Sequence, residues 1–339
     1  MATVSKACCE RYKLMTHSLE EGAVLSQIAT AIRQGSTFLV VAHESPDGDA
    51  MASTLALSNA LREMGKEVLA FNADPVPLKL NFLPGAETLH TQLEAQRRYD
   101  VGIVLDAGEL RRTQVDVTGI CTQTINIDHH PHSEDFGDIY YVDTGASATA
   151  VLIYRILQHM RHPVSLAVAE NIYTAILSDT GSFHYSSANS EAFFVAGEMV
   201  EVGVDPWKVA GGLYESQEAE RLRLLASALA TLQISACGRI AAMYATQQMF
   251  ETAGAGPELA DSFVNYPRSI QGVEVAIFLR EIAPDVYRLS MRSKGRVDVG
   301  QLARDLNGGG HHNAAGAEVR GPLAQIVTDL FMRLQPLLP

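Results

Sequence analysis

Ionisable side chains that could hold metal ions are concentrated in four short segments of the sequence. His43, Asp47 and Asp49 share one loop, in which Pro46 and Gly48 would bend the chain. The other three segments contribute an isolated aspartate, an Asp-His-His triplet and a second isolated aspartate, namely Asp106, Asp128, His129, His130 and Asp179. Burying such groups without partners would be costly. The sequence therefore predicts that they are solvated, paired with one another or bound to metal.

This set holds five aspartates and three histidines, which is too many ligands for one ion. Two divalent cations roughly 3.5 to 4 Å apart are the simplest arrangement, because such a pair activates a bridging water and clamps a phosphoryl oxygen. Oxygen-rich ligation with some imidazole and no thiolate favours Mn²⁺ or Mg²⁺ over structural Zn²⁺. We expect Mn²⁺, while Mg²⁺, Co²⁺, Fe²⁺ and catalytic Zn²⁺ are also compatible with these residues.

Apolar runs that look like buried strands precede three of the four segments. They cover residues 37–42, 101–105 and 124–127, and a further strand is expected at 67–71. Runs without alternation are typical of a parallel sheet covered on both faces. Helical patterns alternate with them, at residues 18–33, 50–64, 147–160 and 165–177. The pattern predicts an open, mostly parallel α/β sheet with helices on both faces and the site at its carboxyl edge.

The length of 339 residues predicts more than one domain. We expect a catalytic domain over residues 18–190, a helical linker over 191–237 and a smaller C-terminal α/β domain over 238–339. In the last domain, strands are expected at 239–244, 273–281 and 286–291, with helices at 299–306 and 322–334. A glycine-rich segment at 307–316 lies between these two helices.

Charge is distributed unevenly along the chain. The net charge is −13, yet residues 238–339 are neutral. Residues 1–237 contain 16 of the 26 basic residues and 29 of the 39 acidic residues, and therefore carry the whole net charge. An acidic half suits cations, and a neutral half with local arginines suits a small anion. The total argues against a surface that holds long nucleic acid through many phosphate contacts.

Cysteine usage and hydropathy indicate a protein of the reducing cytoplasm. The four cysteines form no CxxC pair and no spaced set, so neither a thiolate metal site nor a disulfide framework is predicted. The N-terminus lacks the apolar core of a signal peptide, and no stretch approaches the ~20 apolar residues of a membrane span. We therefore expect a cytoplasmic protein without a membrane partner.

The four segments resemble the motifs of the DHH phosphoesterases. The resemblance rests on His43-x-x-x-Asp47-x-Asp49, on Asp106, on the triplet from Asp128 to His130, and on Asp179. A fifth segment, from Gly308 to Gly316, is similar to the C-terminal domain associated with that family, so the resemblance spans about residues 20–334. Within the family, the chain looks most like bacterial enzymes that degrade very short oligoribonucleotides and remove the 3′-phosphate of 3′-phosphoadenosine 5′-phosphate (pAp).

The resemblance implies a role for each residue of the first half. His43 and Asp47 would hold one ion, and Asp106 would bridge to a second. The second ion would be held by three residues, Asp49, His129 and Asp179. Asp128 would orient an imidazole, as carboxylates commonly do beside metal sites. His130 would contact the phosphate and protonate the leaving oxygen, although the choice of metal ligand between His129 and His130 stays open at this point.

The C-terminal domain would bind the substrate anion. Backbone amides of Gly308, Gly309 and Gly310 could form a nest for an anion, because glycine lets the chain approach a ligand closely. Further contacts are expected from His311, Arg292, Ser293 and Arg268, and arginine suits phosphate through its bidentate fork. The resemblance places the active site in a cleft between the two domains and makes a homodimer an expectation.

Other functions remain compatible with parts of this pattern. The same site could hydrolyse cyclic dinucleotides or their linear products, and a pyrophosphatase would not need the glycine-rich segment. A non-catalytic nucleotide-binding module is a different class, which the complete set of ligand positions disfavours. A long-strand exonuclease would need a broad basic track that the net charge argues against. Taken singly, each segment also has an ordinary explanation as a helix cap or a solvated turn.

Overall fold

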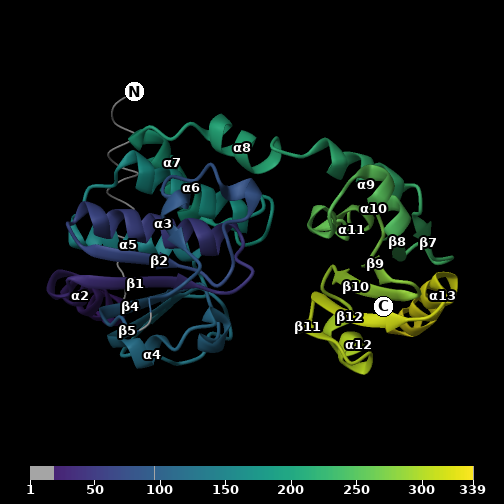
Figure 1. Ribbon diagram of the computed structural model, residues 1–339, viewed down its shortest axis with the longest axis horizontal. Coiled ribbons are helices and arrows are strands. Elements are labelled where there is room, and N and C mark those ends of the chain that lie inside the picture. The colour runs from purple at the N-terminus through teal and green to yellow at the C-terminus, as the bar shows by residue number, and fades with distance from the viewer. Residues whose placement is uncertain (1–18, 95, 339) are drawn as a thin grey trace. The chain divides into compact units, whose positions relative to one another are not determined.

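The chain folds as two compact units, which are divided between Ser216 and Gln217. Figure 1 shows the computed structural model, which describes residues 19–94 and 96–338. Each unit contains one six-stranded sheet and an apolar core of its own. The mixed α/β class expected from the sequence is therefore confirmed for both halves.

The first unit is built on a sheet in which every strand pairing is parallel. The spatial order is β3-β2-β1-β4-β5-β6. These strands are β1 (Thr37–Ala42), β2 (Glu67–Phe71), β3 (Leu89–His90), β4 (Tyr99–Leu105), β5 (Cys121–Asp128) and β6 (Ile139–Val142). The chain order reverses between β1 and β4, and open α/β sheets bind ligands beyond the carboxyl ends of the strands at such a reversal.

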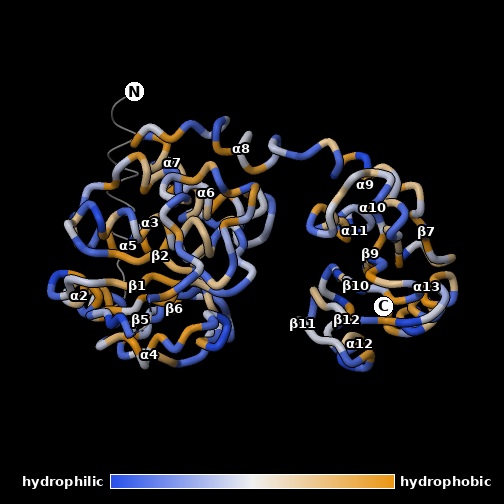
Figure 2. Tube along the Cα trace, viewed as in Figure 1, coloured by the Kyte–Doolittle hydropathy of each residue, from blue (hydrophilic) through white to orange (hydrophobic). Residues whose placement is uncertain are grey.

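Both faces of this sheet are covered. In β1, Phe38 and Val40 pack into the large core of the unit, whereas Leu39 and Val41 face a smaller apolar cluster. This two-sided burial explains the uninterrupted apolar run of β1, which Figure 2 shows in orange. The helices of the unit are α2 (Leu19–Gln34), α3 (Gly48–Glu63), α4 (Val117–Ile120), α5 (Thr149–Met160), α6 (Leu166–Asp179), α7 (Ser190–Val202) and α8 (Pro206–Tyr214), with short 3₁₀ turns η1 (Leu78–Leu80), η2 (Ala86–Thr88) and η3 (Leu110–Thr113).

The expected helical linker over residues 191–237 does not form a separate layer. Val195 of α7 and Val209 of α8 are buried in the core of the first unit. Leu224 of α9 (Ala219–Leu229) is instead buried in a cluster of the second unit, together with Phe263. Each of these helices has an apolar stripe that must be buried. The stripes of α7 and α8 pack in the first unit, and that of α9 packs in the second.

The second unit is a mixed sheet in the order β11-β12-β10-β9-β8-β7, antiparallel except for the pair β8 and β9. Its strands are β7 (Gln233–Ile234), β8 (Ile240–Ala245), β9 (Val275–Ala283), β10 (Val286–Ser293), β11 (Gly309–His311) and β12 (Ala314–Arg320). Besides α9, its helices are α10 (Gln247–Ala253), α11 (Asn265–Arg268), α12 (Val299–Asp305) and α13 (Leu323–Leu334), with 3₁₀ turns η4 (Pro257–Ala260) and η5 (Gln335–Leu337). Residues of α12 and α13 pack on one face, and residues of α9 and α10 pack on part of the other.

The glycine-rich segment differs from the loop expected from the sequence. Gly309 and Gly310 lie in strand β11, which pairs with β12 through a tight hairpin at residues 312–313. Gly310 has a φ of +138°, and a Cβ there would overlap the backbone around Ala315. Glycine is therefore required by the close pairing of the two strands. The segment forms a sheet edge, and strand β12 was not anticipated from the sequence.

Candidate metal centre

Three neighbouring parallel strands deliver ionisable side chains to one edge of the first sheet. His43 follows β1, Asp106 follows β4, and Asp128 ends β5. The register pairs Ala42 with Leu105, and Leu105 with Ile127, so the three strands end at nearly the same level. The polar segments expected at the carboxyl edge of the sheet are therefore brought together at the point where the strand order reverses.

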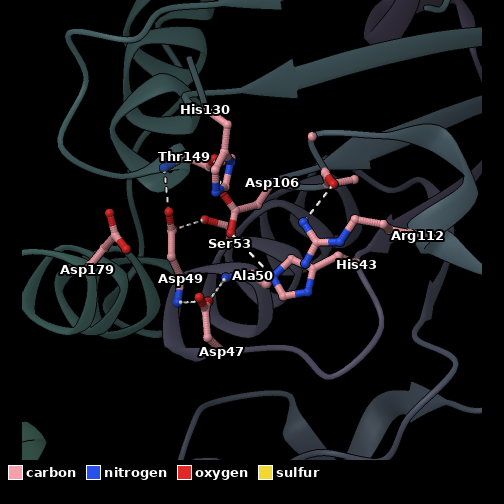
Figure 3. A network of polar contacts seen from close by, with 12 residues as sticks. His43, Asp47, Asp49, Ala50, Ser53, Asp106, Arg112, His130, Thr149 and Asp179 are labelled. Carbon is pink, nitrogen blue, oxygen red and sulfur yellow. Dashed lines mark hydrogen bonds and ion pairs between the residues drawn. The ribbon is translucent and has the colours of Figure 1, made fainter. Parts of the chain in front are cut away.

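Helices α3 and α6 bring the remaining carboxylates to the same edge. Asp47 caps α3, and its Oδ1 accepts hydrogen bonds of 3.0 Å from the backbone amides of Asp49 and Ala50. Asp49 lies in the first turn of α3, and Asp179 is the last residue of α6. Figure 3 shows these carboxylates arranged with Asp106 around a common space.

A glycine allows the two helices to approach so closely. A Cβ at Gly48 would overlap the Oγ and Cβ of Ser178, the residue before Asp179. The absence of a side chain at Gly48 is therefore a requirement of helix packing rather than of loop flexibility. The sequence suggested that Gly48 bends the loop, whereas its main structural effect is to let α3 lie against α6.

The potential metal ligands form clusters that share members. One cluster consists of His43, Asp47 and Asp106, and another of Asp49, His129 and Asp179, with one ligand atom from each residue within 4.8 Å of the others. A third cluster joins Asp106 to both histidines, His129 and His130. Asp106 is therefore shared by two of the three clusters, and His129 links it to the third.

Hydrogen bonds to carbonyl oxygens fix the useful tautomer of two histidines. The Nδ1 of His43 lies 2.7 Å from the carbonyl oxygen of Glu44, and the Nδ1 of His129 lies 3.2 Å from that of Ala146. A carbonyl oxygen only accepts, so each Nδ1 carries a proton and each Nε2 is the ring nitrogen left to bind a metal. Both Nε2 atoms face carboxylates, since those of His43 and His129 lie 3.9 and 3.5 Å from Asp106.

His130 has a different environment from His129. Its Nδ1 donates to Asp128 Oδ1 at 2.7 Å, which turns its Nε2 away from that carboxylate. The side chain of His130 is 42% exposed, compared with 14% for His129. The Nε2 of His129 also lies within 3.8 Å of Asp49 and 3.6 Å of Asp179. His129 is thus surrounded by carboxylates, while His130 is open to solvent.

Asp128 holds the turn that carries both histidines. Its Oδ1 accepts from the backbone amides of His129 and His130 at 2.7 and 3.1 Å, and its Oδ2 accepts from Gly108 at 2.9 Å. Burial alone would raise the pKa of Asp128, but hydrogen bonds from His130 and Ser133 hold it at about 2. In return, the hydrogen bond to Asp128 raises the pKa of His130.

The carboxylates of the two main clusters are held at close range inside the protein. Burial raises the pKa of Asp106 well above its ordinary value, and the charges of Asp49, Asp47 and Asp128 raise it further. Burial and the charge of Asp49 raise the pKa of Asp179 to about 7, and burial also raises that of Asp49. When several carboxylates lie so close together that they do not all ionise readily, cations bound between them would stabilise the ionised forms. The donor set therefore fits hard divalent ions.

Two functional contacts were not predicted from the sequence. Thr149, at the start of α5, donates from its hydroxyl to Asp106 at 2.9 Å and from its backbone amide to Asp49 at 2.6 Å. Ser53 donates to Asp49 at 2.7 Å from one turn further along α3. Neither residue type suggests a role in sequence, because hydroxyls one turn along a helix or at its start usually have structural functions. Only the placement of α5 against the sheet edge reveals the contact to Asp106.

The second unit contains the arginines expected to bind an anion. The pKa of Arg292 is lowered by burial and by the charge of Arg268, so these two guanidinium groups lie near each other. The Nε of Arg268 is buried without a hydrogen-bond partner among the described residues. Two neighbouring cations without a described acidic partner are the kind of arrangement that an anion stabilises.

Two other residues expected in this site are placed differently. Ser293 is buried and donates to the side chain of Asn313 at 3.0 Å, so its hydroxyl faces away from the side on which Arg292 lies. The backbone of His311 belongs to β11, while its side chain lies outside the described part of the structure. Gly309 and Gly310 line the same cavity as Arg292.

Comparison with known proteins identifies the family. The model of the DHH family N-terminal domain matches residues 37–178, and that of the DHHA1 domain matches residues 241–332. A protein of Thermus thermophilus is 34% identical over 303 residues, which cover 89% of each chain. The chain therefore belongs to the DHH family, with a DHHA1 domain as its second unit, and the resemblance seen in the sequence is confirmed.

The names of individual relatives refer to the hydrolysis of phosphate compounds. The Thermus protein bears the name bifunctional oligoribonuclease and PAP phosphatase NrnA, as does a Bacillus subtilis protein that is 27% identical over 87% of this chain and 93% of its own. A solved structure of an exopolyphosphatase-related protein from Bacteroides fragilis superposes with a TM-score of 0.87 at 29% identity, covering 93% of this chain and 97% of the other. Among residues 19–94 and 96–338, no helix is long and apolar enough to span a membrane.

Proposed function

We propose that this protein is a metal-dependent phosphoesterase that hydrolyses short oligoribonucleotides and removes the 3′-phosphate of pAp. The observation that carries the proposal is a set of three linked ligand clusters. Asp106 belongs to two of them, and His129 connects these to the cluster with Asp49 and Asp179. The names of the Thermus and Bacillus relatives support the choice of substrates. The acidic first unit suits the cations, and the arginines of the second unit suit the substrate anion.

Each ligand would have a defined place. His43 and Asp47 would hold one ion, and Asp106 would bridge to the second. The second ion would be held by Asp49, His129 and Asp179. The free Nε2 atoms of both histidines support this assignment. When bound, the two ions supply an activated water and neutralise charge on the phosphoryl oxygens. We propose Mn²⁺ as the preferred ion, because the ligands are mainly oxygen with two imidazoles.

The protein's own groups would position the substrate and move its proton. Asp128 holds His130 through Nδ1, so the Nε2–H of the imidazolium form can donate to the leaving oxygen. The raised pKa of His130 keeps more of this form near neutral pH. Thr149 fixes the carboxylates of Asp106 and Asp49 in place before any ligand binds. Arg292 and Arg268 would contact the phosphate or base of the nucleotide.

A substrate panel tests the proposal. The purified chain is incubated with pAp, with the linear dinucleotide pApA and with cyclic di-AMP, each in Mn²⁺, Mg²⁺ or Co²⁺. We expect phosphate release from pAp and cleavage of pApA, with Mn²⁺ giving the highest rate. Preferential cleavage of cyclic di-AMP would reassign the substrate, and intact substrates under all conditions would indicate a nucleotide-binding module instead.

A further inference from the structure

A groove in the second unit extends beyond the residues already assigned to the anion. It encloses about 650 Å³ on the sheet face opposite the packed helices α12 and α13. Its walls include small residues of three neighbouring strands, among them Ser290, Gly309 and Gly316. Small side chains on adjacent strands leave the sheet surface hollow. The lining residues place the groove along β10, with β9 on one side and β12 and β11 on the other.

Strand alternation puts arginines on this side of β10. Tyr287, Leu289 and Met291 contribute to the apolar core beneath the sheet. Side chains alternate across a strand, so Arg288 and Arg292 face the opposite side, and both line the groove. Arg292 is four positions after Arg288, which places their Cα atoms about 13 Å apart along the strand. Side chains stand roughly perpendicular to a sheet, so two guanidinium groups held in this way contact separate phosphate groups.

A second like-charged pair lies at the end of the groove away from Arg292. Arg280 of β9 is directly opposite Arg288 of β10 in the antiparallel register, and both line the groove. Like charges directly opposite each other in a sheet are destabilising. A bound anion or neighbouring acidic residues would therefore stabilise this pair of arginines.

The acidic residue beside this pair already forms an ion pair with another arginine. Glu318 lies on the other side of Arg288 in the register, but its carboxylate is paired with Arg320 at 2.8 Å. Arg280 donates to the carbonyl oxygen of Pro257 at 2.8 Å, which leaves its charge uncompensated. Within the described residues, the side chain of Arg288 has no hydrogen bond or ion pair. Glu318 also lines this end of the groove, but its Oε1 is shared with Arg320, so two guanidinium groups here face a single carboxylate that is already paired.

We propose that Arg280 and Arg288 form a second phosphate subsite, which binds an internal phosphodiester of a short RNA while another phosphate of the same strand contacts Arg292. The inference rests on the proposed function and deepens it. The groove selects substrates with several linked nucleotides, because only they carry phosphates far enough apart to contact both ends. In pAp, both phosphates belong to one nucleoside and cannot span the same distance.

Binding measurements without turnover test the subsite. The full chain in EDTA is titrated with a fluorescent 5′-phosphorylated RNA tetramer, and pAp is measured by competition, at several salt concentrations. We expect Arg288→Ala to weaken tetramer binding about fivefold more than pAp binding. The slope of log K against log salt should fall in magnitude by about 0.7, because one phosphate contact is lost from a single strand. Arg288→Lys should restore part of the loss.

Arg333→Ala provides the matched control. Arg333 is an exposed arginine on α13, the helix that packs under the other face of the sheet. This variant removes the same charge from the same unit and should bind both ligands as the wild type does. The subsite would be overturned if Arg288→Ala weakened binding of the tetramer and of pAp equally. It would also be overturned if the Arg288 and Arg333 variants bound both ligands with the same affinities.

The outcome is separable from that of the proposed function. If the wild type binds the tetramer through Arg288 but cleaves nothing in the substrate panel, the subsite stands and the phosphoesterase proposal fails. If it cleaves pApA but Arg288→Ala shows no length-dependent loss, the phosphoesterase proposal stands and the subsite fails.

Discussion

Asp106 combines a buried charge with an unusual backbone. Its φ is +57°, in the left-handed region that few residues other than glycine, asparagine and aspartate adopt readily. It is 1% exposed, and its Oδ1 accepts from the hydroxyl of Thr149. An asparagine preserves both the backbone preference and this hydrogen bond, and it removes only the charge. The substitution Asp106→Asn is therefore a cleaner probe than alanine.

We predict that Asp106→Asn abolishes turnover and stabilises the metal-free protein. Loss of a bridging carboxylate should reduce kcat/KM by about a thousandfold or more, since several kcal/mol of transition-state stabilisation are removed. In EDTA at pH 8, the variant should melt at a higher temperature than the wild type, because one of the mutually repelling buried charges is gone. Rates in Mn²⁺ and melting curves in EDTA measure the two effects.

Asp285→Asn is the control for this substitution. Asp285 has the same φ of +57° and lies exposed in the turn between β9 and β10. It should change neither activity nor melting temperature appreciably. Near-normal turnover in Asp106→Asn would refute the shared ligand position.

The pair Asp128 and His130 gives a prediction about pH. As a proton donor, His130 must be protonated, so activity should fall as the pH rises through its pKa. Asp128 raises that pKa, and Asp128→Asn removes the charge that does so. In the variant, the fall in kcat should therefore begin at a lower pH, and kcat at pH 7 should drop by about 10- to 100-fold. The pH profile of kcat measures both effects. An alkaline limb in the same place would mean that His130 is not the donor.

At the scale of elements, the contact of α3 with α6 sets the geometry of the centre. Asp47 and Asp49 are carried by α3, and Asp179 ends α6, so a shift between the helices would separate the carboxylates of the proposed metal sites. Gly48 permits the contact, because any larger residue would overlap Ser178. The precision of the site therefore depends on a residue that binds nothing.

We predict that Gly48→Ala lowers both activity and stability. Forcing a methyl group into this contact should cost about 1–3 kcal/mol of the free energy of unfolding, and kcat should fall with it. The double variant Gly48→Ala/Ser178→Gly should recover part of both losses, because the overlapping atoms are removed. Urea unfolding and kinetics on the same samples measure this.

Gly197→Ala is the matched control for the helix contact. Gly197 lies within α7, and a Cβ there would meet nothing within 4 Å. Alanine should raise stability by up to about 1 kcal/mol, since it favours the helix, and should leave kcat unchanged. If Gly48→Ala behaves like Gly197→Ala, the packing account is wrong.

At the scale of the whole molecule, the metal-free first unit should lose stability as the pH rises. Asp179 has a pKa of about 7 in the folded protein and near 3.8 when unfolded, and the pKa values of Asp49 and Asp106 are also raised. The folded state thus binds more protons, so the destabilisation from Asp179 begins near pH 3.8, grows as the pH rises and levels off just above pH 7. The raised pKa values of Asp49 and Asp106 add to this loss. Between pH 6 and pH 8, the melting temperature in EDTA should fall.

Divalent ions should reverse this dependence. Binding favours the ionised carboxylates and releases protons, so Mn²⁺ should raise the melting temperature more at pH 8 than at pH 6. Thermal melts with EDTA or Mn²⁺ at the two pH values measure the effect, and Asp179→Asn should reduce it. Equal stabilisation by Mn²⁺ at both pH values would contradict the coupling between metal binding and proton release.

The sequence by itself determined the elements that carry the centre. Uninterrupted apolar runs predicted β1, β4 and β5, and the acids and histidines beyond them predicted a site at the carboxyl edge. These inferences hold because parallel strands end at a common edge, so residues far apart in sequence are placed together by strand position alone. The distribution of charge was also readable from the sequence, since the whole net charge of −13 lies in residues 1–237.

Only the tertiary structure decided which faces and partners these residues have. The strand register places Arg280 opposite Arg288 and buries Ser293 on the other face of the sheet. A shift of one residue would turn these side chains to the opposite faces and undo both placements. The backbone carbonyl of Ala146, 17 residues from His129, selects that imidazole's tautomer. Packing against two separate cores divided the expected linker, and strand pairing drew Gly309 and Gly310 into β11. Such contacts join distant segments, and no local pattern of residues encodes them.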